Sequence, residues 1–163
     1  MFLRQLWNLP TSRFILHHTD VDQDALTLVV ESRSKRCHCP ACHQYSRSIH
    51  SSYQRCIKDL PCFALKTRIR LTTYKFYCRN PHCPQKIFNE RFAAGFGYYK
   101  RMTDRLSDLL SSLVLQLTGR SAERICYLLH IDVSDTTLRE GCCRSNPYQS
   151  QSRLRYWVLM IGR

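Results

Sequence analysis

The sequence predicts an α+β chain, in which a small β-rich N-terminal part is followed by a three-helix domain. Residues 65–77 alternate between apolar and polar side chains, which is the period of a half-buried strand. In residues 106–117 the apolar side chains recur instead at helical spacing. The cysteines support the same division, because two close pairs of them fall within the β-rich part.

Strands are expected throughout the β-rich part. Residues 14–17 and 25–31 flank the acidic stretch Val-Asp-Gln-Asp, and the second of them is rich in β-branched residues, so together they predict a hairpin. A further strand over residues 53–61 is expected to stop at its proline. Residues 94–99 contain two glycines and are interpreted as a linker.

Three helices are expected in the C-terminal part. Thr103 is a typical N-cap for the first helix, and Gly119 is a typical helix end. Ser121 begins the second helix and Ser134 begins the third, which is expected to reach about Gly141. The second helix, the turn His-Ile-Asp-Val-Ser and the third helix match a helix-turn-helix. A generic three-helix bundle fits the leucine spacing equally well, and the basic strands nearby favour the first interpretation.

The chain is strongly basic. Its 163 residues include 25 Lys and Arg against 12 Asp and Glu, a formal charge of +13. Residues 33–101 hold 15 of the basic residues but only two acids, Asp59 and Glu90, so this stretch carries the whole excess. Such a one-sided excess suits the phosphates of nucleic acid. Because the sequence lacks a membrane-span-length apolar run and a secretory signal, we expect a cytoplasmic chain without a membrane partner.

Four of the ten cysteines form two pairs at metal-binding spacing, Cys39-x-x-Cys42 and Cys78-x4-Cys83. Tetrahedral Zn²⁺ is held by two such pairs on tight turns, so the spacing predicts a structural zinc site of four thiolates. Neighbouring side chains leave the ligand set open to substitution by Cys37, His38, His43 or His82. The competing interpretation is that these cysteines are ordinary small hydrophobic residues or reactive thiols. For Cys56, Cys62 and Cys126 we do expect the small hydrophobic role, at buried or half-buried positions.

Two groups of side chains are expected to contact DNA. Lys66, Arg68 and Arg70 share one face of the strand over residues 65–77, and they would meet phosphates. The third helix would place Thr and Arg side chains at base edges in the major groove. The full set is Lys66, Arg68, Arg70, Arg79, Ser134, Thr136, Thr137 and Arg139.

The order of the motifs resembles a known family. CPAC is followed by YQRCIKDLP, FYCRNPHCPQKIFNER, YYKRMTDRL and VSDTTL. Over residues 37–144 this order resembles the N-terminal half of bacterial insertion-sequence transposases of the IS-L-three type. The resemblance implies a zinc ribbon and a helix-turn-helix, followed in the family by a DDE-type catalytic domain with an RNase-H-like fold. It also implies that Cys39, Cys42, Cys78 and Cys83 hold the zinc, and that residues 134–140 help to recognise the terminal inverted repeats of the element.

The expected function is that of a DNA-binding transposase fragment that recognises the element ends for DNA transposition. Its partners would be double-stranded DNA and, as a possible homodimer, a second copy of the chain. The alternative is a free-standing zinc-containing helix-turn-helix transcriptional regulator. A zinc enzyme of another kind is the weakest interpretation, because four cysteines close the metal site. No catalytic residue is assigned, since the acids do not form the carboxylate cluster that DDE chemistry needs.

The resemblance also sets the expected domain boundaries and points to a truncation. The expected parts are a β-hairpin and zinc ribbon at 1–93, a linker at 94–102, a helix-turn-helix at 103–144 and a tail at 145–163. The family's catalytic domain opens with a strand like LGVDDWA. Codons for residues 156–163, read from the third base, can give this string, and three of its residues are forced because Trp157 and Met160 have single codons. We therefore expect an out-of-frame tail; the alternative is a genuine C-terminal strand.

Overall fold

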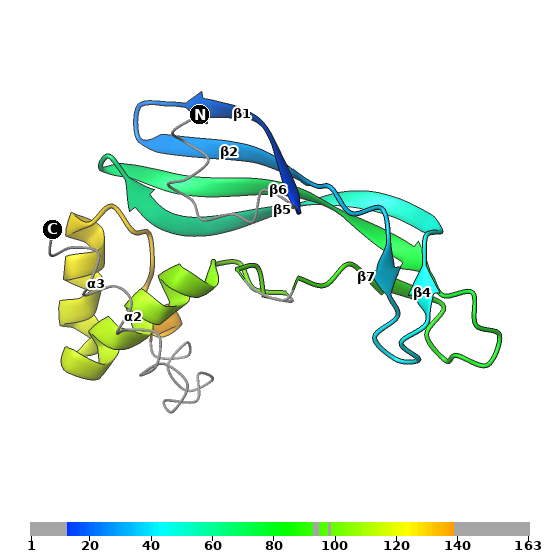
Figure 1. Ribbon diagram of the computed structural model, residues 1–163. Coiled ribbons are helices and arrows are strands. Elements are labelled where there is room, and N and C mark those ends of the chain that lie inside the picture. The colour runs from blue at the N-terminus through cyan, green and yellow to red at the C-terminus, as the bar shows by residue number, and fades with distance from the viewer. Residues whose placement is uncertain (1–12, 93–94, 98, 139–163) are drawn as a thin grey trace, which may run out of the picture. The chain divides into compact units, whose positions relative to one another are not determined.

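The computed structural model describes residues 13–92, 95–97 and 99–138 (Figure 1). The chain divides into two compact units, Met1–Asp104 and Arg105–Arg163. The first unit is built from strands, and the second contains the helical segments. Within the part of the chain that is described, none of the helices combines the length and the hydrophobicity that crossing a bilayer requires.

A five-stranded sheet forms most of the first unit, as Figure 1 shows. β1 (Phe14–Val21) and β2 (Ala25–Ser32) pair as an antiparallel hairpin. β5 (Ile49–Cys62) and β6 (Leu65–Tyr77) form a second antiparallel hairpin. A parallel pairing of β2 with β6 joins the two hairpins, which gives the order β1-β2-β6-β5. β7 (Ile87–Asn89) pairs with the far end of β6.

Alternation of apolar and polar residues places the core on one side of this sheet. Along β2, Leu26, Leu28 and Val30 are buried, while the residues between them are half-buried. Ile69 and Leu71 of β6 lie opposite Leu28 and Val30 in the parallel register, so these side chains share one face. The core that results contains the buried residues Phe14, Leu26, Leu28, Val30, Ile57, Ile69, Leu71 and Phe96.

The strands over residues 25–31 and 65–77 are confirmed, and the other two extend beyond their predicted ranges. β5 continues through Pro61 because the pairing with β6 shifts between Asp59 and Cys62, so no regular ladder bond is needed there. The hairpin then turns at Phe63 and Ala64, whose φ values of 52° and 61° are those of a tight two-residue turn.

A second, two-stranded sheet lies between β2 and β5 in the sequence. It pairs β3 (Cys37–His38) with β4 (Tyr45–Ser46) in antiparallel register. The turn between β3 and β4 and the turn between β6 and β7 each carry one of the close cysteine pairs. The fold thus presents both pairs on β-hairpin turns, which is the arrangement of a zinc ribbon.

The second unit contains most of α2 (Asp104–Gln116) and all of α3 (Gly119–Leu128). After His130, whose φ of 58° ends the helical path, a single helical turn covers residues 135–138. The prediction of an α+β fold with a three-helix helix-turn-helix domain is wrong. The protein is β-rich, and no such three-helix domain follows the ribbon within the described residues.

The side chains of α2 and α3 explain why the helical pattern misled the sequence-based prediction. Leu106, Leu110, Ala122 and Cys126 are buried, as the helical spacing suggests. Other apolar side chains on the same helices stay exposed, among them Leu115, Tyr127 and Leu128. Leucine spacing therefore identified helices, but not a closed three-helix core. The rest of the third predicted helix, from residue 139, and the predicted tail lie outside the described residues.

Candidate metal centre and nucleic-acid interface

The turn between β3 and β4 positions the first cysteine pair. The backbone N–H of Cys39 donates to the Gln44 carbonyl at 2.9 Å, and the backbone N–H of His43 donates back to the Cys39 carbonyl at 2.9 Å. His43 takes a left-handed conformation, with φ of 57°, which closes the turn after Cys42. This tight turn brings Cys39 and Cys42 to one side of the loop.

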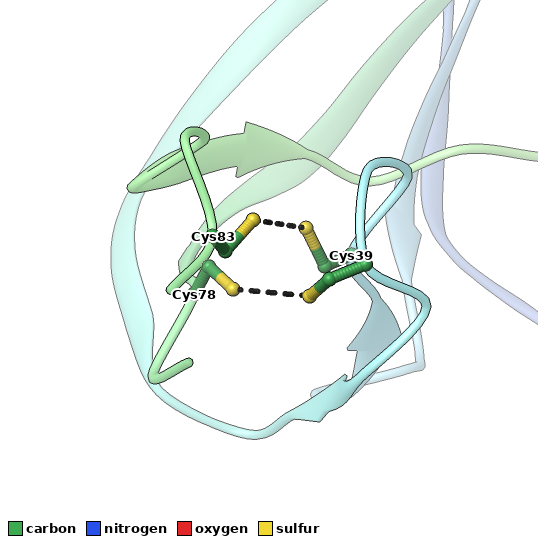
Figure 2. A group of neighbouring side chains, drawn as sticks. Cys39, Cys78 and Cys83 are labelled. Carbon is green, nitrogen blue, oxygen red and sulfur yellow. Dashed lines mark hydrogen bonds between the residues drawn. The ribbon is translucent and has the colours of Figure 1, made fainter. Parts of the chain in front are cut away.

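The turn between β6 and β7 positions the second pair. The backbone N–H of Cys78 donates to the Lys86 carbonyl at 2.7 Å, and the backbone N–H of Cys83 donates to the Asn80 carbonyl at 3.2 Å. Because β6 runs directly into Cys78, the main sheet fixes where this turn begins. Figure 2 shows the two turns facing each other, with Cys39 on one side and Cys78 and Cys83 on the other.

The four sulfur atoms form one compact group, all within 4.8 Å of one another. Cys39 Sγ lies 3.8 Å from Cys83 Sγ, and Cys42 Sγ lies 3.5 Å from Cys78 Sγ, so each short distance joins the two turns. A tetrahedral Zn²⁺ with Zn–S bonds of about 2.3 Å separates its sulfur ligands by about 3.8 Å. The sulfur geometry therefore fits a tetrahedral zinc ion.

The thiols of Cys42, Cys78 and Cys83 differ in how readily they ionise. A backbone hydrogen bond from Gln44 lowers the pKa of Cys42 to about 6. A backbone hydrogen bond from Asn80 favours the thiolate of Cys78, but burial and the neighbouring sulfurs outweigh it and raise the pKa of Cys78 to about 12. Burial also raises the pKa of Cys83. Sulfurs this close can all be thiolates only when a cation offsets their mutual repulsion, and a bound metal ion does so.

The site is closed by aromatic packing. Cys39, Cys78 and Cys83 are buried together with Tyr74, Phe76 and Phe88. The rings of Phe76 and Phe88 stack, with centroids 5.9 Å apart. Four sulfurs complete a tetrahedral shell and leave no position for a substrate or a water molecule, which is typical of a structural zinc site.

The alternative ligands that the sequence left open lie outside the sulfur group. Among the described residues, Cys39, Cys42, Cys78 and Cys83 are the group whose side chains could hold a metal ion. Cys37 Sγ instead lies 3.7 Å from the His38 carbonyl, and His38 Nδ1 lies 3.0 Å from the His43 carbonyl. The choice of four cysteines over these neighbours therefore follows from the fold.

Comparison with known proteins points to the same part of the chain. Residues 35–84 match the family model for the zinc-finger of transposase IS204/IS1001/IS1096/IS1165, an ISL3-type zinc ribbon. The sulfur geometry and this match confirm the prediction of a structural Zn²⁺. The match covers both cysteine pairs together with β5 and β6, and it leaves residues 1–34 and 85–163 outside it. No curated protein and no solved structure matches the chain.

The side of the five-stranded sheet that faces away from its core is basic. We call it the outer face, and the pairing registers place on it Thr27, Val29, Glu31, Gln54, Cys56, Lys58, Lys66, Arg68, Arg70 and Thr72. Arg68 and Arg70 are exposed, and Lys58 lies opposite Arg68 across the β5–β6 pair. Three cationic side chains from two neighbouring strands therefore lie close together on one surface.

The two acids of the basic stretch are withdrawn from the surface. Asp59 is 4% exposed and accepts a hydrogen bond from Thr103 Oγ1 at 2.7 Å. Glu90 is 6% exposed and accepts hydrogen bonds from Ser32 and Thr73, while burial raises its pKa. Both carboxyl groups are buried, so neither one offsets the charge of the exposed cations at the surface. The positive charge of residues 33–101 is thus concentrated at the surface.

A polar network marks the end of the outer face nearest the ribbon. The Tyr74 hydroxyl donates to Glu31, Lys35 Nζ lies 2.9 Å from Glu31 Oε1, and His17 Nε2 lies 2.8 Å from Glu31 Oε2. Together these partners, Tyr74 first among them, lower the pKa of Glu31 to about 2. The network stabilises the junction of β1, β2 and β6, and it neutralises the single acid that we placed on the outer face.

The predicted DNA-contacting residues divide into three groups. Arg68, Arg70 and Arg79 are exposed and Lys66 is half-buried, all in the first unit. Ser134, Thr136 and Thr137 are exposed in the second unit, and Arg139 lies outside the described residues. Because the prediction of a helix-turn-helix domain was wrong, the fold does not support the expected role of residues 134–139 in recognising bases.

Sequence reasoning did not place Lys58 on the outer face. Its place opposite Arg68 depends on the β5–β6 register, which the sequence does not reveal directly. It also missed the fact that Cys56 is exposed beside Arg70, where a buried or half-buried residue was expected. The alternation within residues 53–61 was the available signal, because it places Cys56 and Lys58 on the side opposite buried Ile57.

Proposed function

We propose that this chain binds double-stranded DNA as part of an insertion-sequence transposase, and that the outer face of the sheet contacts the phosphate backbone. The zinc ribbon would hold the end of this sheet in a fixed conformation beside the DNA. The DNA we propose is the duplex at the ends of the mobile element. The observation that carries the proposal is the separation of charge in residues 33–101, in which the acids are buried and cations are exposed.

Electrostatics support a backbone contact rather than base recognition. Arg68 and Arg70 extend from one strand, about 6.6 Å apart along it, beside Lys58 on the neighbouring strand. Each cation that meets a phosphate releases condensed counterions, so binding of this kind is strong at low salt and falls as salt rises. Such contacts position a protein on DNA without reading its sequence.

The match to a transposase zinc-finger model supports the biological setting. The matched region, residues 35–84, contains both cysteine pairs and the whole of β5 and β6, and therefore includes Lys58, Arg68 and Arg70. The three cations of the outer face and the four cysteines thus belong to the same matched segment. We infer that the family's zinc ribbon serves DNA binding in this chain.

The test measures duplex affinity against salt concentration with the full chain, using fluorescence anisotropy. Arg68→Ala and Arg70→Ala should each weaken binding to all duplexes alike, and each should flatten the slope of log K against log salt by about 0.9 per lost phosphate contact. Arg120→Ala is the charge-matched control, because Arg120 is exposed on α3 in the other unit. Unchanged affinity and slope in both outer-face variants would contradict the proposal.

The choice of DNA is tested separately by footprinting. Protection of the inverted repeats that flank the gene would support the element ends as the target. Protection confined to a promoter elsewhere would favour a transcriptional regulator and would contradict the transposase assignment.

A further inference from the structure

We propose that the zinc ribbon carries a second DNA site, at which Tyr45 and Tyr77 stack on unpaired bases of single-stranded DNA. This site goes beyond the duplex contacts of the outer face, since it uses different residues and a different form of the ligand. We call it the ribbon aromatic patch, and it consists of Tyr45, Tyr77, His50, Arg36, Arg47 and Arg79.

The first ring of the patch is Tyr45 on β4. Tyr45 is 40% exposed, although the ribbon nearby has a buried cluster of cysteine and aromatic side chains. The guanidinium carbon of Arg47 lies 5.6 Å from the centre of this ring, and that of Arg36 lies 5.9 Å away. Both distances fall within the range of a cation–π contact, so the ring has two cations beside it.

The second ring is Tyr77, at the end of β6 next to Cys78. It is 38% exposed, and the guanidinium carbon of Arg79 lies 5.4 Å from its centre. Arg79 is itself held in place, because its Nε donates to Ser48 Oγ at 3.0 Å. The His50 ring contacts Tyr77 edge-on at 4.8 Å between centroids. Tyr77 thus stands in a fixed position between an aromatic and a cationic side chain.

The backbones that carry the two rings are fixed to each other. Ser46, next to Tyr45, donates from its hydroxyl to the Tyr77 carbonyl at 2.6 Å. The backbone N–H of Tyr77 donates in turn to the Ser48 carbonyl at 2.8 Å. These bonds and the neighbouring cysteine turns place both rings on one rigid ribbon. The loss of side-chain freedom on binding is then small.

The chemistry of the patch fits single-stranded DNA. Aromatic rings flanked by guanidinium groups bind the faces of bases by stacking and the adjacent phosphates by charge. In a duplex the base faces are covered by their neighbours, so an exposed tyrosine ring can stack only on a base that is unpaired. No acid occurs between residues 33 and 58 of the sequence to repel the phosphates.

The experiment measures the affinity of the full chain for a labelled oligo(dT) of about 12 nucleotides. The same oligonucleotide with abasic sites has equal charge but no base faces, so it reports charge alone. We expect the oligo(dT) to bind more tightly than the abasic strand. Tyr45→Ala and Tyr77→Ala should each lower oligo(dT) affinity by about tenfold and bring it towards that of the abasic strand.

Conservative and matched variants separate stacking from loss of fold. Tyr45→Phe and Tyr77→Phe keep the rings and should retain oligo(dT) affinity. Tyr127→Ala removes an exposed tyrosine of α3 and should also retain it. The zinc content of each alanine variant shows that its ribbon is folded, and duplex affinity should stay unchanged.

Two results would overturn the inference. One is equal affinity for the abasic and oligo(dT) strands. The other is unchanged oligo(dT) affinity in both zinc-loaded alanine variants, which would leave these rings as a surface for a protein partner or for no partner. Failure of the duplex proposal would look different, because it appears in Arg68→Ala and Arg70→Ala on double-stranded DNA.

Discussion

The main sheet and the zinc ribbon share one strand but are stabilised by different chemistry. The main sheet buries aliphatic and aromatic side chains from β1, β2, β5 and β6. Half of the buried residues in the ribbon cluster are cysteines, beside Tyr74, Phe76 and Phe88. Burial of apolar area stabilises the first region directly. The second buries too little apolar surface to stand alone, so its stability depends on the metal.

This difference predicts that the two regions lose structure under different conditions. Removal of the metal should release the two cysteine turns and leave the four-strand part of the sheet folded. A defect in the apolar core should destabilise the sheet while the sulfur atoms still bind zinc. A substitution in one region should therefore affect the stability of that region and leave the other region unchanged.

Cys78→Ser is expected to have the largest effect, because it removes one of the four sulfurs and leaves three to hold the ion. We expect zinc to be lost and the ribbon to unfold, since structural zinc contributes folding free energy directly, on the order of 10 kcal/mol in small zinc domains. Bound zinc is measured by elemental analysis, and loss of order by amide hydrogen exchange in residues 35–46 and 78–90.

Cys56→Ser is the matched control for that change. Cys56 is exposed on the outer face and lies outside the sulfur group, so its substitution should leave zinc content and exchange unchanged. Full zinc occupancy in Cys78→Ser would remove Cys78 from the ligand set. Global unfolding of the same variant would show that the main sheet also depends on the metal.

Leu28→Ala tests the main sheet and is expected to have an intermediate effect. Leu28 is fully buried at the centre of the core, so truncation should leave a cavity and lower the free energy of unfolding by about 3 kcal/mol. Denaturant unfolding measures this change, with zinc content as the second readout. Val21→Ala, at a residue 68% exposed, should cost little. Loss of zinc in folded Leu28→Ala would contradict the independence of the two regions.

Sequence reasoning succeeded where the pattern is local. The alternation in residues 65–77 predicted β6, and the spacing of the cysteines predicted the zinc site. It could not find the parallel pairing of β2 with β6, because more than thirty residues separate these strands and no turn signal connects them. It therefore could not show that residues 14–32 belong to the same sheet as the basic strands.

The helical part illustrates the opposite error. Leucines at helical spacing predicted α2 and α3, but the predicted boundary between them was wrong. α2 ends at Gln116, and Gly119 begins α3 with Thr118 as its N-cap, in place of the N-cap predicted at Ser121. The step from helices to a three-helix domain required tertiary packing, which periodicity does not specify. The exposed side chains of Leu115 and Tyr127 show that apolar residues on these helices do not all face a core.

Glu31→Gln is expected to have the smallest effect, and it acts at the junction of the two regions. The pKa of Glu31 is about 2 in the folded chain, against an ordinary value of 4.5, so the ionised form stabilises the fold. This stabilisation is complete above pH 4.5 and is lost as the pH falls towards 2. The stability of the parent chain should therefore fall more steeply over this range than that of Glu31→Gln.

Thermal unfolding of both proteins in chelator measures this difference without a contribution from zinc. Asp24→Asn is the matched control, because Asp24 is an exposed acid of the β1–β2 turn and the change likewise replaces a carboxylate by its amide. Parallel pH profiles for the parent chain and Glu31→Gln would show that the Glu31 network does not stabilise the junction.

β6 runs without interruption from the arginines of the outer face into Cys78. Successive side chains of a strand point to opposite faces. The number of residues between Arg70 and Cys78 therefore decides whether their side chains lie on the same face or on opposite faces. Deletion of a single residue within 72–77 would turn either the guanidinium groups or the sulfur to the wrong side, whereas deletion of two would preserve the phase and only shorten the strand. The length of this segment is therefore constrained to steps of two, whatever side chains it carries.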